Sequence, residues 1–126
     1  MSGEVVHFEI PMDDAERGQA FYRDVFGWNI DAMPEFEYAM ALTSPVDENG
    51  RPAQPGAING GMMQRRDPLT TPIVTVSVDD IDATLETVAS HGGSTVLEKS
   101  PVGDMGYAAY FRDSEGNIMG LWQNAT

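Results

Sequence analysis

The stretch Val5-Val6-His7-Phe8-Glu9-Ile10-Pro11-Met12-Asp13-Asp14 alternates between two kinds of side chain. A period of two residues indicates a β-strand whose two faces differ. One face carries Val6, Phe8 and Ile10, and we expect it to pack against a helix, because Asp13 or Asp14 can cap a helix that starts there. The other face carries His7 and Glu9, the two side chains of this strand that are able to do acid–base chemistry.

The same plan returns at residues 73–80, which read Ile-Val-Thr-Val-Ser-Val-Asp-Asp. Each copy continues with an amphipathic pattern that ends at glycine, at Gly27 in the first copy and at residues 91–93 in the second. Three further strands are predicted after each helix, over 28–30, 37–42 and 57–64, and then over 94–98, 105–112 and 117–123. The chain therefore contains two β-α-β-β-β modules, one over about residues 4–65 and one over about 70–124, with a long loop at 43–56.

The predicted fold class is α+β. A module of this size cannot bury both a helix face and a sheet face alone, so we expect the two modules to form one curved mixed sheet around a cavity, with the helices on the outer face. In the second copy, Ile73 and Thr75 occupy the positions that correspond to His7 and Glu9 in the first. In this arrangement Val6, Phe8 and Ile10, and likewise Val74, Val76 and Val78, lie beneath the helices.

Composition narrows the range of functions. A net charge of −13 argues against nucleic acid and against anionic membranes, because binding to either relies on Lys and Arg. The absence of cysteine excludes disulfides, zinc–thiolate sites and thiol nucleophiles. No apolar run is long enough to span a bilayer, and the start of the chain has no secretory signal pattern, so we expect a cytoplasmic protein.

Two such modules in a chain of this length resemble the vicinal oxygen chelate (VOC) superfamily, which includes glyoxalase I, bleomycin-resistance proteins and extradiol dioxygenases. The most recognisable pieces are His-Phe-Glu-Ile-Pro-Met-Asp-Asp at residues 7–14, Ala-Phe-Tyr-Arg-Asp-Val-Phe-Gly-Trp at 20–28 and Phe-Arg-Asp-Ser-Glu-Gly-Asn-Ile-Met-Gly-Leu-Trp-Gln at 111–123. The resemblance covers nearly the whole chain and implies a single VOC domain over residues 1–126. It leaves the function open, because this fold serves lyases, oxygenases, epimerases and ligand binders.

The resemblance also implies four metal-ligand positions, which fall at His7, Gly61, Ile73 and Gly120. Only His7 has a donor atom, and Glu9 could add a second, whereas a stable divalent site usually needs three or more protein ligands. We therefore expect no metal ion and no other cofactor. His7 and Glu9 could instead act as a general base and its orienting carboxylate, or simply as a polar lining.

The remaining candidate residues are expected to line the cavity. Trp122 shares a face with Gly120 if alternation holds, and its indole could stack on a flat ligand. The full set of predicted ligand-binding residues is His7, Glu9, Asn59, Ile73, Thr75, Tyr107, Gly120 and Trp122.

The sequence favours a glyoxalase-like protein that binds a small hydrophobic or aromatic molecule in the sheet cavity without metal. One alternative is a metal-independent lyase or isomerase that uses His7 and Glu9. A second is an antibiotic-sequestering protein of the bleomycin-resistance type, and a third is a degenerate member that acts only through protein contacts. Whether it is an enzyme is therefore left open, and a homodimer is the expected assembly.

Overall fold

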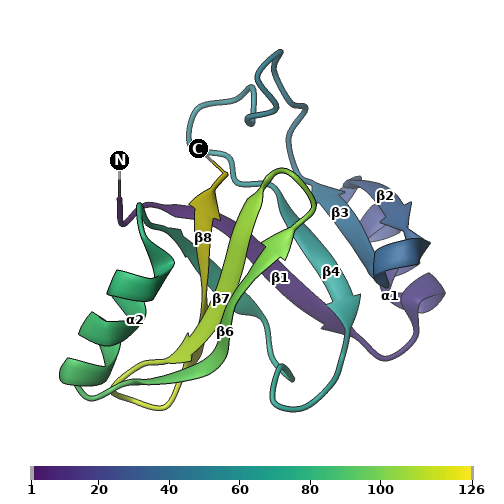
Figure 1. The fold of residues 1–126 in the computed structure, drawn as a ribbon. Helices are drawn as coiled ribbons and strands as arrows, with labels where there is room; N and C mark the ends of the chain where they lie inside the picture. Colours follow the sequence, from purple (N-terminus) through teal and green to yellow (C-terminus); the bar gives the residue numbers. More distant parts are fainter. Residues whose placement is uncertain (1, 126) are drawn as a thin grey trace. The chain divides into compact units, whose positions relative to one another are not determined.

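Both predicted modules are present in the computed structural model, which describes residues 2–125 (Figure 1). The first module consists of β1 (Val5–Met12), α1 (Ala15–Phe26), β2 (Asn29–Met33), a short 3₁₀ turn η1 (Pro34–Phe36), β3 (Tyr38–Leu42) and β4 (Gly60–Gln64). The second consists of β5 (Ile73–Ser77), α2 (Ile81–Ser90), β6 (Ser94–Val102), β7 (Gly106–Arg112) and β8 (Ile118–Asn124). The predicted α+β class is confirmed. None of the helices within residues 2–125 is long and apolar enough to cross a membrane.

The chain divides into two compact units. The N-terminal unit comprises residues 7–72, and its strands are hydrogen-bonded in the order β2-β3-β4-β1. Among the described residues, the C-terminal unit comprises 2–6 and 73–125, with the order β5-β8-β7-β6. Residues 2–6 belong to the C-terminal unit because the Gly3 amide donates to the Ser77 carbonyl (2.6 Å) and the Ser77 amide donates to the Glu4 carbonyl (2.8 Å).

Each unit contains a mixed arrangement of strands. In the N-terminal unit β1 runs parallel to β4, while β3 is antiparallel to both β2 and β4. In the C-terminal unit β5 runs parallel to β8, while β7 is antiparallel to β8 and β6. The parallel partners are the first and last strands of each module, so residues from the two ends of a module lie side by side.

The helices begin and end where the sequence predicts. The Asp14 carboxylate caps α1 by accepting from the Arg17 amide, and Gly27 ends the helix in the left-handed conformation with φ of 73°. The Asp80 carboxylate caps α2 by accepting from the Ala83 amide, and His91 follows the last residue of that helix.

Each helix covers one face of its own strands. Under α1 the buried residues come from β1, β3 and β4, and Tyr22 packs against them together with Phe8, Ile10, Trp28 and Ile30 around Met12, Ala39, Ala41 and Met62. Under α2 the buried residues are Ile81, Leu85, Ala109 and Leu121. The helix-facing positions of β5 that contribute to this core are Val76 and Val78.

The prediction that Val6 and Val74 lie buried beneath the helices is wrong. Val6 is 42% exposed and Val74 is 40% exposed. Neither residue belongs to the hydrophobic cluster under its helix, because α1 and α2 are short, with 12 and 10 residues, and cover only the later part of β1 and β5. The helix-facing series therefore begins at Phe8 and at Val76.

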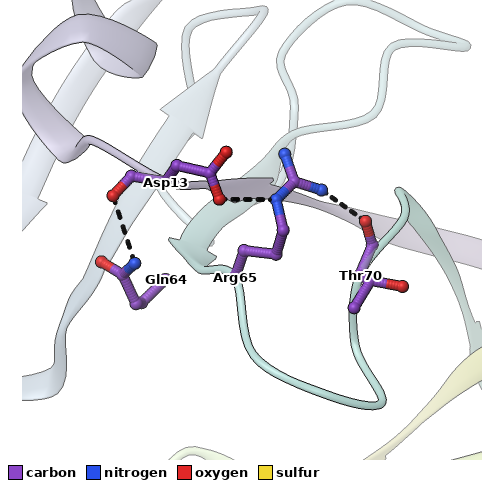
Figure 2. A network of polar contacts seen from close by, with 4 residues as sticks. All are labelled: Asp13, Gln64, Arg65 and Thr70. Carbon is purple, nitrogen blue, oxygen red and sulfur yellow. Dashed lines mark hydrogen bonds and ion pairs between the residues drawn. The ribbon is translucent and has the colours of Figure 1, made fainter.

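A polar network joins the end of β1 to the end of β4 (Figure 2). The Arg65 guanidinium donates to the Asp13 carboxylate over 2.8 Å and also to the Thr70 carbonyl, while the Gln64 amide donates to the Asp13 carbonyl over 3.2 Å. The Arg65 amide also donates to the Met12 carbonyl (2.8 Å). These bonds continue the parallel pairing of β1 and β4 one residue beyond the strands and so fix the register that matters for the site.

The buried Met62 provides a test of this core. Replacing Met62 with Ala should lower the free energy of unfolding by about 2–5 kcal/mol, because the side chain is fully buried among the residues under α1 and its loss leaves a cavity. Met105 is 63% exposed, so the matched Met105→Ala variant should change stability by less than about 0.5 kcal/mol. Urea unfolding curves measure both. Equal losses would show that the core has been assigned to the wrong face.

Candidate ligand-binding site

His7, Glu9 and Tyr38 meet on the face of the N-terminal unit that α1 does not cover. His7 and Glu9 come from β1, and Tyr38 is the first residue of β3. The Tyr38 hydroxyl lies 2.8 Å from His7 Nε2 and donates to Glu9 Oε2 over 2.9 Å. Glu9 is 8% exposed, so its carboxylate depends on such donors inside the protein.

The three polar groups form one connected network. The Tyr38 hydroxyl has one proton, and it donates that proton to Glu9. The role of His7 Nε2 in its 2.8 Å contact with the Tyr38 hydroxyl, as donor or as acceptor, depends on the tautomer of the imidazole ring.

Tyr38 reaches this position because residue 61 is glycine. Gly61 stands opposite Glu9 on one side and opposite Met40 on the other, so β4 places it in the centre of the face. A Cβ at position 61 would lie 1.7 Å from the Tyr38 hydroxyl oxygen, far inside any permitted contact. The phenol thus occupies the volume that a side chain at position 61 would fill.

Burial lowers the pKa of the His7 imidazole below its ordinary value of 6.5, and the nearby negative charge of Glu9 partly opposes this shift. Desolvation is the larger of the two effects, because removing an imidazolium from water is unfavourable. His7 is therefore neutral at pH 7 and able to accept a hydrogen bond or a proton.

The C-terminal unit carries a second group of the predicted site residues. Ile73 is 1% exposed and Thr75 is 6% exposed, and Thr75 pairs with Gly120 of β8. A Cβ at Gly120 would lie 2.6 Å from the Thr75 hydroxyl oxygen, so a hydroxyl again fills the space above a glycine. Trp122 lies on the same face of β8, half-buried, and its indole N–H donates to the Asn124 amide oxygen over 2.8 Å.

Two predicted residues lie elsewhere. Tyr107 lies on the face covered by α2, packs on the core there, and holds the Lys99 ammonium 4.5 Å from the centre of its ring. The tyrosine that shares a face with Gly120 is Tyr110, its direct partner across β7 and β8. Asn59 anchors the long loop, since its side chain accepts from the Ser44 amide (2.9 Å) and donates to the Ser44 carbonyl (3.0 Å).

The donor set does not fit a divalent metal ion. His7 Nε2, Glu9 and the Tyr38 hydroxyl are already bonded to one another, and the family's second ligand position is the glycine whose side-chain space Tyr38 fills. Ile73 and Gly120 have no donor atoms in their side chains. Within residues 2–125 the structure brings together no group of three His, Asp or Glu side chains that could hold an ion.

Comparisons with known proteins agree with this architecture. Residues 4–44 match the family model described as bleomycin resistance protein-like N-terminal. A glyoxylase-like domain-containing protein of Didymella fabae is 30% identical over 122 residues, which cover 93% of this chain and 91% of that protein. The lactoylglutathione lyase of Haemophilus influenzae is 27% identical over 117 residues, 90% of this chain and 87% of that protein.

The chain belongs to the glyoxalase-like proteins of the VOC superfamily. It is also 30% identical to a protein of Mycobacterium tuberculosis provisionally named glyoxylase CFP32, of which it spans only 43% of the length. Among solved structures, the hypothetical protein BH1468 of Bacillus halodurans has a TM-score of 0.65 at 12% identity, covering 98% of this chain and 96% of that one. A Streptomyces coelicolor methylmalonyl-CoA epimerase variant has a TM-score of 0.64 at 16% identity, with both chains fully covered.

The contact between Tyr38 and position 61 predicts a strong coupling of two substitutions. Gly61→Ala should destabilise the protein by about 1–3 kcal/mol, because the new methyl group collides with the phenol. In a Tyr38→Ala background the same change should be nearly neutral, since the colliding hydroxyl is gone. A double-mutant cycle measured by urea unfolding gives the coupling energy. Additive effects of the two substitutions would contradict the arrangement.

The lowered pKa of His7 predicts a pH-dependent stability. The contribution is fully present above pH 6.5, where both states are uncharged at this residue. It falls with pH below 6.5, because the unfolded chain then binds a proton that the folded protein still rejects, with a slope of at most ~1.4 kcal/mol per pH unit. Unfolding curves at pH 7.5 and 5.5 should show a smaller loss for His7→Gln than for the unchanged protein. His91 is exposed, so His91→Gln serves as the control and should keep the original pH dependence.

Proposed function

We propose that this protein binds a small hydrophobic or aromatic molecule without a metal ion, at the face of the N-terminal unit that carries His7, Tyr38 and Glu9. The observation that carries the proposal is the hydroxyl of Tyr38, which takes the space of a metal-ligating side chain and joins the two remaining polar groups into one network. A polar network of this kind positions a ligand without needing an ion.

Apolar residues on the same face support an organic ligand. Pro11 and Met63 are buried and pair with each other across β1 and β4, and Met63 also stands opposite Tyr38 across β3 and β4. Small-molecule sites typically combine an apolar lining with a few oriented polar groups. The face around His7 has this composition. Sequestration of an antibiotic is a specific form of the proposal, favoured by the bleomycin resistance-like match over residues 4–44.

An enzyme is the second candidate. A neutral histidine held by a tyrosine and a carboxylate can act as a general base, as a metal-independent lyase or isomerase acting on a carbonyl substrate would require. The named activity of the Haemophilus relative, lactoylglutathione lyase, gives this candidate some support. Binding and catalysis would use the same residues and are separated by measuring turnover.

A ligand screen tests both candidates. The melting temperature should rise with at least one compound from a set of antibiotics (including bleomycin), aromatic metabolites and carbonyl metabolites. It should not rise with Zn²⁺, Ni²⁺, Fe²⁺ or Mn²⁺. Elemental analysis of the purified protein should show less than one equivalent of these metals. His7→Ala and Glu9→Gln should weaken binding, while replacing the exposed His91 with Ala should leave it unchanged.

If the protein is an enzyme, His7→Ala and Glu9→Gln should instead lower kcat by ~10²–10⁴. One bound equivalent of metal that disappears in His7→Ala would overturn the metal-free proposal.

The proposal extends to a cytoplasmic homodimer. Strands β2 and β6 stand at the ends of the strand orders given above, and sheet edges invite pairing between chains. A closed two-fold dimer is the commonest such assembly. Light scattering of this chain at micromolar concentration should give a mass near twice its 13.7 kDa. A mass near that of one chain would remove the dimer.

A further inference from the structure

The Nδ1 atom of His7 is left available by the network described above. His7 makes one hydrogen bond within the described part of the chain, and it uses Nε2. No buried side-chain nitrogen or oxygen among those residues lacks a hydrogen-bond partner. Nδ1 has no hydrogen-bond partner among them, so it is not fully buried and keeps some contact with solvent.

We propose that Tyr38 is a positioning residue that holds His7 in the Nε2–H tautomer, so that Nδ1 accepts a hydrogen bond from the ligand. This inference rests on the proposed function and adds the ligand's chemical class. The ligand must present a hydrogen-bond donor, and a hydroxyl on an aromatic or enol group fits best.

The direction of the hydrogen bonds supports an acidic hydroxyl. The ligand would donate to His7 Nδ1, His7 Nε2–H donates to Tyr38, and Tyr38 donates to the Glu9 carboxylate. All bonds in this chain point toward the single negative charge, so each strengthens the next. A donor that readily gives up part of its proton benefits most from this arrangement. A ligand group that can only accept a hydrogen bond would be repelled by the lone pair of Nδ1.

The opposite tautomer is disfavoured by the same contacts. With the proton on Nδ1, the Nε2 lone pair would need the Tyr38 proton. The phenolic oxygen and the Glu9 carboxylate would then stand 2.9 Å apart with no hydrogen between them. Two acceptor oxygens at this distance repel each other unless a proton lies between them, so the contact between Tyr38 and Glu9 favours the Nε2–H tautomer.

The tautomer can be measured in the free protein by ¹⁵N spectra of labelled histidine at pH 8. His7 should show a protonated Nε2 and an unprotonated Nδ1. Tyr38→Phe should produce a mixture of the two tautomers, while Tyr107→Phe, which removes a hydroxyl on the face covered by α2, should leave the His7 signals unchanged. Glu9→Leu is an independent variant, because it removes the carboxylate that accepts the Tyr38 proton, and the share of the Nδ1–H tautomer should rise. A protonated Nδ1 in the unchanged protein, or His7 signals unaffected by both Tyr38→Phe and Glu9→Leu, would overturn the proposal.

The ligand class is tested with phenol and anisole, which differ by a methyl group on the donor oxygen. Phenol should shift the Nδ1 signal of His7 in a saturable way at millimolar concentration, and anisole should shift it at least tenfold less. Equal shifts, or no shift with either, would overturn the donor assignment. Failure of this inference and failure of the proposed binding function give different results. Ligands from the thermal-shift screen that carry no donor would remove this inference and leave the proposed binding function, whereas a screen without ligands would remove the binding function even if the tautomer is as expected.

Discussion

The hydroxyl of Tyr38 is the group on which the arrangement of the candidate site depends. A carboxylate at Glu9, 8% exposed, is costly to bury unless a donor faces it, and Tyr38 supplies that donor over 2.9 Å. The same oxygen lies 2.8 Å from His7 Nε2 and thereby orients the ring. Both bonds require the phenol to lie directly over β4, which a residue with a side chain at position 61 would prevent. The packing of the phenol against Gly61 and the contacts of His7 and Glu9 therefore depend on one another.

In the two units, different side chains fill the space above the glycine of the last strand. In each, the first and last strands run parallel, and a glycine of the last strand stands opposite the residue two places after the family's first ligand position, at Glu9 and Gly61 and at Thr75 and Gly120. In the C-terminal unit the opposing threonine itself fills the space above glycine. In the N-terminal unit a tyrosine from the neighbouring strand β3 fills it. In the N-terminal unit a histidine and a carboxylate are thereby linked through the tyrosine.

Periodicity and capping signals were enough to predict the elements, because alternation and Asp caps are local properties. The face that His7 and Glu9 share also follows from alternation within one strand. The role of Tyr38 does not, since it depends on the pairing of β3 with β4 after a long loop. The faces of the tyrosines depend on strand pairing in the same way: Tyr38 faces His7, whereas Tyr107 lies under α2 and Tyr110 pairs with Gly120. Burial of Val6 and Val74 failed as a prediction because helix length sets how much of a strand is covered.

The close approach of Tyr38 to Gly61 also constrains how this lineage can change over generations. A codon change that puts a metal-binding side chain at position 61 meets the phenol first, and a change that removes the phenol first leaves Glu9 without this donor. We expect either single change to lower stability, so selection acting on single steps would preserve both residues. A metal-binding side chain at position 61 would have to arrive together with a smaller residue at position 38.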